Sequence, residues 1–166
     1  MQKFIFGTIA LLLCCMFVQP VTAQKTLPSI TVKTLEGKSV DLQSYADNNK
    51  VTVLSFWATW CAPCKKELDA IADLYPEWKE EYDVEIVAVS IDTRRQFAKV
   101  PGMVATKGWE YEILSDTNQA SLQALNFQTI PMTIVLDKSG QIVYTHNSYT
   151  PGDEYELEEK IEAASR

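Results

Sequence analysis

Apolar runs alternate along the chain with segments whose apolar residues recur at helical spacing. The runs are rich in β-branched residues and have few polar interruptions, which predicts strands buried on both faces of a parallel or mixed sheet. They are Val51–Ala58, Val84–Ser90 and Met132–Leu136. The helical segments between them are Cys64–Tyr82, Thr93–Lys107 and Asn118–Phe127. This alternation predicts an α/β fold with a central mixed β-sheet flanked by helices.

A hairpin is predicted to open the fold and a helix to close it. Ser29–Val32 and Ser39–Leu42 flank a turn that contains Gly37, a residue suited to a positive φ. We expect this hairpin at the edge of the sheet. Near the other end, Gln141–His146 is predicted as a strand and Glu154–Ser165 as an amphipathic helix.

The first 23 residues have the pattern of an export signal. Lys3 supplies a basic start, Phe4–Val18 is an apolar run, and the segment ends in small or modest side chains at Val21-Thr22-Ala23. We therefore expect a signal peptide over 1–23 and one soluble, exported domain over 24–166. An uncleaved membrane anchor is the main alternative.

A lipid anchor is a second alternative, because Cys14 and Cys15 lie near the signal. Lipid attachment requires a small residue immediately before the cysteine, whereas Cys14 follows Leu13. The sequence therefore favours cleavage over lipidation.

Composition narrows the function classes. Hydrophobic residues make up 46% and charged residues 22% of the chain, which is typical of a globular protein. The formal net charge is −7, from 15 Lys and Arg against 22 Asp and Glu. An acidic balance of this size makes a phosphate-neutralising surface unfavourable, so we expect no nucleic-acid partner.

Two cysteines remain once the predicted signal is removed, Cys61 and Cys64. An exported domain stabilised by disulfides would carry four to eight spread cysteines, and a loop closed by residues this near each other constrains little of the unfolded chain. A zinc site needs four ligands, yet the domain has no third cysteine and a single distant histidine, His146. The pair is therefore predicted to be redox-active, with no metal.

The two cysteines follow a buried strand and open a helix. At a helix N-terminus the Cys61 sulfur faces unpaired backbone N–H groups and the positive end of the helix dipole, which favour the thiolate. Cys61 is thus predicted as the nucleophile. Cys64, one turn further along, is placed to attack a mixed disulfide on Cys61. Pro63 fits the first turn, where its missing N–H costs little.

The segment from Phe56 to Glu67 resembles the active site of the TlpA/ResA-like thiol-disulfide oxidoreductases of the thioredoxin superfamily. Similarity continues through Thr129–Thr133, which resembles the cis-proline loop of that family, and covers most of Ser29–Ala164. The resemblance implies a thioredoxin-like fold with an N-terminal hairpin. It also implies a central βα insertion, which we place around Trp109–Leu125.

The resemblance also implies an activity. The protein is expected to be a bacterial, periplasmic or otherwise exported protein-disulfide reductase that cycles Cys61 and Cys64 between dithiol and disulfide. Client proteins carrying disulfides are the expected partners, a membrane thiol carrier of the CcdA/DsbD type the expected reductant, and cytochrome c maturation one setting. We expect no cofactor beyond the redox-active disulfide. We expect the protein to be a monomer. The residues expected to contact clients are Trp60, Ala62, Pro63, Ile130 and Pro131.

Glu67 is predicted to exchange protons with the cysteines. It shares the apolar face of the helix with Leu68 and Ile71, where a carboxyl should have a raised pKa. Thioredoxin itself keeps a buried acid where this chain has Ser55, and ResA-like proteins have a functional glutamate at the place of Glu67. The alternative is that Glu67 lies at the edge of the apolar face and extends to water.

Other interpretations stay open at this point. A disulfide oxidase or isomerase is the nearest alternative, and a non-catalytic client-binding module is another. A peroxidase of the peroxiredoxin type needs a peroxidatic cysteine in a different local setting. We assign no catalytic role to His146, and expect Trp57, Trp78 and Trp109 to lie in the core.

Overall fold

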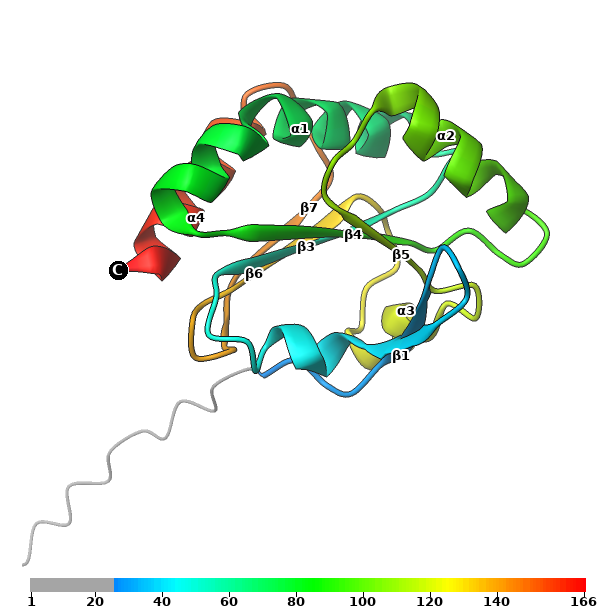
Figure 1. Ribbon diagram of the computed structural model, residues 1–166, viewed down its shortest axis with the longest axis horizontal. Helices are drawn as coiled ribbons and strands as arrows, with labels where there is room; N and C mark the ends of the chain where they lie inside the picture. Colours follow the sequence, from blue (N-terminus) through cyan, green and yellow to red (C-terminus); the bar gives the residue numbers. More distant parts are fainter. Residues whose placement is uncertain (1–25) are drawn as a thin grey trace, which may run out of the picture.

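One mixed sheet carries the strands of the domain, in the order β2-β1-β5-β4-β3-β6-β7 (Figure 1). The structure, a computed structural model, describes residues 26–166, so the predicted signal peptide lies outside the described residues. The strands are β1 (Thr31–Thr34), β2 (Ser39–Asp41), β3 (Thr52–Trp57), β4 (Glu85–Ser90), β5 (Glu112–Ser115), β6 (Met132–Leu136) and β7 (Ile142–Asn147).

Strand β3 is an inner strand with one parallel and one antiparallel neighbour. It runs parallel to β4 and antiparallel to β6, while β5 runs parallel to β4. Every residue of β3 is buried, as predicted from its near-continuous apolar run. The predicted α/β fold with a mixed sheet is therefore confirmed.

The N-terminal hairpin forms one edge of the sheet. Strands β1 and β2 pair antiparallel around a turn in which Gly37 has φ +88°, a value that a residue with a Cβ rarely adopts. β1 begins at Thr31, two residues later than predicted, because the preceding segment bonds to a side chain: Asp41 accepts from the Ile30 N–H at 3.0 Å.

Helices cover both faces of the sheet. The structure has α1 (Ala62–Tyr82), α2 (Val100–Lys107), α3 (Ala120–Ala124) and α4 (Asp153–Ser165), with short 3-10 helices at η1 (Leu42–Tyr45) and η2 (Phe97–Lys99). Figure 1 shows α1, α2 and α4 on one side of the sheet and η1 with α3 on the other. Trp57 and Trp78 are fully buried and Trp109 nearly so, which confirms their predicted place in the core.

Two predicted helices are shorter than the sequence pattern indicated. The helix expected from Thr93 begins at Val100, because Pro101 suits the first turn of a helix and Thr93 instead bonds to the Gln96 side chain. The helix expected over Asn118–Phe127 is reduced to α3, which is bounded by residues with positive φ, Gln119 and Asn126.

The predicted insertion connects the hairpin to the rest of the sheet. Strand β5 pairs with β1 on one side and β4 on the other, and α3 follows it. Trp109, just before β5, packs edge-on against Trp57, with ring centroids 5.1 Å apart. The insertion is thus part of the same core as β3.

The described chain begins at the end of the sheet where β6 turns into β7. Thr26 forms an isolated antiparallel bridge with Gln141. Gly140 in this turn has φ +77°, and a Cβ there would meet the Ala46 carbonyl oxygen at 2.3 Å, so the turn packs directly on backbone.

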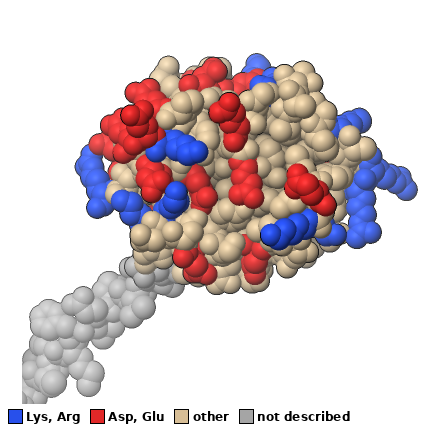
Figure 2. Space-filling model, viewed as in Figure 1, with Lys and Arg blue, Asp and Glu red and all other residues tan. Residues whose placement is uncertain are grey.

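The surface has charges of both signs. On the face in Figure 2, acidic and basic side chains are interspersed on the left, and Lys and Arg project from the right-hand edge. Within residues 26–166, no helix has both the length and the apolar character needed to cross a membrane.

Candidate active site

A disulfide joins Cys61 and Cys64 where β3 leads into α1. Their Cα atoms are 5.4 Å apart. Cys61 is the N-cap residue of α1, with extended backbone angles, and Cys64 lies in the first turn. Cys61 is 4% exposed and Cys64 is fully buried, so only the Cys61 side of the disulfide is in contact with solvent.

The helix N-terminus directs backbone polarity at the Cys61 sulfur. The Cys64 N–H donates to Cys61 Sγ at 3.2 Å, in the manner of a side-chain cap. Pro63 lies in the first turn, where the missing N–H leaves no bond unmade. In the reduced protein these groups favour a thiolate at Cys61 over one at Cys64.

The loop before β6 lies directly beside the disulfide. The Ile130–Pro131 peptide bond is cis, which confirms the expectation drawn from the resemblance. Cys61 Sγ is 3.8 Å from the Ile130 carbonyl oxygen. A segment 69 residues further along the chain therefore meets Cys61 through its backbone.

A groove lies between this loop and Trp60, the residue before Cys61. Trp60, 58% exposed, forms one wall, and the floor includes Ile91 and Ile130. Leu122, from the insertion, and Phe127, which follows it, also line the groove. Trp60 and Ile130, which we predicted to contact clients, both line the groove. Of the other three predicted contact residues, Ala62 and Pro63 are exposed and Pro131 is buried, and none of the three lines the groove.

Glu67 is buried in α1, one turn after Cys64. It is 4% exposed, so it does not extend to water as the alternative interpretation required. The Ser55 hydroxyl donates to one carboxylate oxygen at 2.9 Å, and the Thr133 hydroxyl donates to the other at 2.7 Å. The carboxyl group thus links α1 to β3 and to β6.

Burial raises the pKa of Glu67 above its ordinary value of 4.5, because little solvent is available to stabilise the charge. The hydrogen bonds from Thr133 and Ser55 act in the opposite direction, as does the positive charge of His146 when it is protonated. Burial is the largest of these effects. A carboxyl of this kind can accept and return a proton nearer neutral pH than an exposed one can.

Two residues that support the site were not singled out from the sequence. Buried Asp92 accepts from the Thr59 N–H at 2.8 Å and from the Thr59 hydroxyl at 2.7 Å, so it fixes the backbone just before Trp60. Thr133 binds Glu67 from β6. Their positions in the sequence could have indicated them, because Asp92 follows the end of β4 and Thr133 follows the proline loop.

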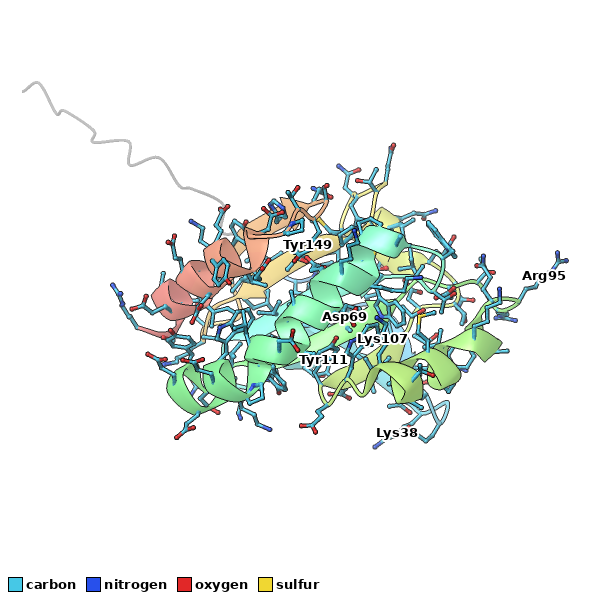
Figure 3. All side chains as sticks on the ribbon, turned by 90° about the horizontal axis from the view of Figure 1, so that it is seen from above. Lys38, Asp69, Arg95, Lys107, Tyr111 and Tyr149 are labelled. Atoms are coloured by element: carbon cyan, nitrogen blue, oxygen red, sulfur yellow. A yellow bond between two sulfur atoms is a disulfide. The ribbon has the colours of Figure 1, made fainter. Side chains whose placement is uncertain are left out.

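The other side of α1 is held by the insertion. Asp69 accepts from Trp109 Nε1 at 3.0 Å and pairs with Lys107, and Tyr111 donates to the Leu68 carbonyl at 3.0 Å. Figure 3 shows Asp69, Lys107 and Tyr111 along one side of α1 and Tyr149 across the helix from them. These bonds fix the helix that carries Cys64 and Glu67.

The described part of the chain offers no cluster of three or more His, Cys, Asp or Glu side chains able to hold a metal ion. The redox group that the structure shows is the disulfide itself.

Comparisons with known proteins agree with this geometry. The AhpC/TSA family model matches residues 23–145. Thiol-disulfide oxidoreductase ResA of Bacillus thuringiensis (strain Al Hakam) is 33% identical over 119 residues, which are 72% of this chain and 66% of that protein. The ResA protein of Geobacillus kaustophilus is 31% identical over 122 residues, 74% of this chain and 67% of that one.

The solution structure of a thioredoxin-like protein from Porphyromonas gingivalis is also similar. It superimposes with a TM-score of 0.75 at 40% sequence identity, over 84% of this chain and 91% of that one. The fold is therefore thioredoxin-like. The chain covers slightly less than two thirds of the length of the B. thuringiensis relative.

Proposed function

Because the chain belongs to the AhpC/TSA family and the matched segment contains both cysteines, we propose that it is a thiol-disulfide oxidoreductase that reduces disulfide bonds of other proteins. The observation that carries this proposal is the position of Cys61. It caps a helix, forms a disulfide with Cys64, and lies 3.8 Å from the carbonyl oxygen of Ile130. The similarity to proteins named thiol-disulfide oxidoreductase supports the same chemistry.

The cycle begins with both cysteines reduced. The Cys61 thiolate attacks one sulfur of a client disulfide, forms a Cys61–client disulfide, and releases the other client sulfur as a thiolate that takes up a proton. Cys64 then gives its proton to Glu67 and attacks Cys61 Sγ. The Cys61–Cys64 disulfide forms and the second client sulfur leaves as a thiolate. Two electrons pass from the dithiol to the client.

The groove beside Cys61 is the proposed client-binding surface. A client segment in extended form can pair with the exposed backbone of the Ile130 loop, in the way that peptides add to a strand edge. Its apolar side chains would then contact Trp60 and Leu122. A groove lined mainly by apolar side chains accepts many sequences, which suits a protein with several clients.

The direction of transfer and the cellular setting are part of the proposal. An external dithiol must return two electrons to the disulfide after each turnover, and we propose a membrane thiol carrier of the CcdA/DsbD type. We also propose that the domain is exported after removal of residues 1–23 and acts as a monomer. Cytochrome c maturation is the setting that the ResA-like resemblance favours.

An insulin-reduction assay tests the activity. Wild-type protein with dithiothreitol should accelerate insulin precipitation, and the Cys61→Ser variant should not exceed dithiothreitol alone. Equal rates for the two proteins would mean that the domain does not catalyse reduction and only binds clients. A parallel peroxide-consumption assay, in which we expect no activity, separates this function from a peroxidase.

The reduction potential of the Cys61/Cys64 couple tests the direction. A value near the roughly −270 mV of thioredoxin supports a reductase. A value near the roughly −120 mV of a strong oxidant would instead assign the protein to disulfide formation.

A further inference from the structure

A small cavity lies between α1, β6, β7 and the first turn of α4. Glu67, Ile71 and Thr133 form its inner wall. Its outer wall includes His146 and Asp153. The enclosed space is enough for about one water molecule. Glu67, otherwise buried, therefore shares a cavity with two ionisable groups that are themselves partly exposed.

His146 has a defined position at this cavity. Its Nε2 atom lies 3.3 Å from Asp153 Oδ2, and its ring stacks on Tyr144 with centroids 6.1 Å apart. About a third of each of the two side chains is exposed, 30% for His146 and 32% for Asp153. His146 is thus partly exposed to solvent and also lines the cavity that Glu67 lines.

The partner of His146 is also fixed. Asp153 Oδ2 accepts the Thr150 N–H at 2.7 Å, which holds the carboxylate at the start of α4. Neighbouring Glu154 accepts the Tyr149 hydroxyl and the Gly152 N–H, both at 2.8 Å. The pair is therefore built into the turn that begins the helix.

We propose that His146 is a positioning residue for the exchange reaction: across this cavity, its charge sets the charge state of Glu67, and Asp153 opposes it. This rests on the proposed function, in which Glu67 takes the proton of Cys64. Protonated His146 favours the carboxylate form of Glu67, which is the form able to accept that proton. Histidine is the side chain that can carry or lack a positive charge near neutral pH, so His146 is the group at this cavity able to change the charge that faces Glu67.

The other ionisable groups around Glu67 do not supply this change. Tyrosine side chains remain neutral near pH 7, and burial raises their pKa values further here. The acidic groups carry the sign opposite to that of protonated His146. The ionisable groups that line the cavity with Glu67 are Tyr144 and His146 from β7, Tyr149 from the following loop, and Asp153 and Glu154 from α4. Tyr111, just before β5, faces Glu67 from another side. Glu156 and Lys160 of α4 contact Tyr144.

The test is a carboxyl NMR titration of Glu67 in the oxidised protein, where the cysteines do not titrate. His146→Gln should raise the pKa of Glu67 by about half a unit, because a positive charge is lost, and Asp153→Asn should lower it by a similar amount. The exposed neighbour Thr145 provides the control, since Thr145→Gln lies on the same strand and should leave the curve unchanged. His146→Asn replaces His146→Gln if the latter does not fold.

A kinetic measurement uses the same variants. At a pH well below the pKa of Glu67, release of a Cys61-linked client should be about threefold slower in His146→Gln and about threefold faster in Asp153→Asn, since half a unit of pKa changes the small ionised fraction of Glu67 by about that factor there. Superimposed Glu67 titration curves for wild type and a folded His146 variant would overturn the proposal. The titration needs no turnover, so this result is independent of the insulin assay.

Discussion

The Ser55 hydroxyl donates a 2.9 Å hydrogen bond to Glu67, and both residues are buried. A strand and a helix thus share one polar contact inside an apolar core. Thioredoxin, by resemblance, carries its buried acid at the strand position, whereas here the strand supplies a hydroxyl and the helix supplies the acid. The carboxyl group accordingly lies on the same helix as Cys64, one turn away.

Replacing Ser55 by alanine should change both stability and titration. The variant leaves one oxygen of a buried carboxyl without its donor, which costs about 1–2 kcal/mol of unfolding free energy. The hydrogen bond lowers the pKa of Glu67, so its loss should raise that pKa further. Urea unfolding and a carboxyl NMR titration measure the two effects.

Ser115 offers a matched control for this substitution. Its hydroxyl is buried and has no hydrogen-bond partner among the described residues. Ser115→Ala removes a hydroxyl group that is buried without a hydrogen bond, so the unfolding free energy should stay the same or rise slightly. Equal losses in both variants would mean that the contact with Glu67 contributes nothing specific.

Glu67 should make the domain less stable as pH rises. Its pKa is higher in the folded than in the unfolded protein, so above about pH 4.5 the unfolded chain loses this proton first. Unfolding free energy should then fall by about 1.4 kcal/mol per pH unit until the folded-state pKa is passed. Glu67→Gln carries no such proton, and its stability relative to wild type should rise across the same window. Parallel stability curves from pH 4 to 8 would contradict the raised pKa.

The same substitution should alter thiol reactivity. Ionised Glu67 disfavours a nearby thiolate, so Glu67→Gln should lower the apparent pKa of at least one cysteine in the reduced protein. It should also slow disulfide exchange, because the proton acceptor for Cys64 is gone. Alkylation rates measured against pH report the first effect and insulin reduction the second. Identical alkylation profiles for the two proteins would make the carboxylate a bystander.

The two cysteines should behave differently when replaced one at a time. Cys64→Ser removes the resolving thiol, so Cys61 should accumulate as a mixed disulfide with clients. Cys61→Ser should form few adducts, since Cys64 is fully buried. Non-reducing gels followed by mass spectrometry count the adducts. Adducts found mainly in Cys61→Ser would reverse the assignment of nucleophile.

Trp60 should matter for client binding and little for folding. It is 58% exposed, so Trp60→Ala removes groove surface without opening the core. We expect a several-fold higher KM for a protein disulfide and a thermal midpoint within about 2 °C of wild type. Tyr155→Ala is the control, because Tyr155 is 63% exposed and lies on α4. A similar rise in KM in both variants would argue against a specific contact.

The sequence was sufficient for the features that depend on local pattern. The β-branched run before Trp60 predicted β3, and the apolar spacing after Cys64 predicted α1. The same spacing placed Glu67 on the buried face of α1, where the structure has it. The ends of helices were harder to predict from the sequence. Thr93 bonds to the Gln96 side chain and Gln119 has a positive φ, and no apolar pattern reveals either feature.

Contacts between distant segments could not be obtained in the same way. Thr133 and Glu67 are 66 residues apart and meet only because β6 pairs with β3 beside α1. His146 looked like an isolated histidine, and its place across a cavity from Glu67 depends on where β7 and α4 come together. Such relationships follow from the order of strands in the sheet, which single-chain periodicity does not determine.

The bridge between Thr26 and Gln141 shows at which end of the sheet the described chain begins. Gln141 lies in the β6–β7 turn, next to the end of β6 that pairs with the start of β3, whereas the disulfide follows the end of β3. The chain therefore enters the domain at the pole opposite to Cys61. A tether, fusion partner or solid support attached ahead of Thr26 would therefore join the domain at the end away from Cys61, so that immobilisation through this end leaves the face around Trp60 and Cys61 directed outward.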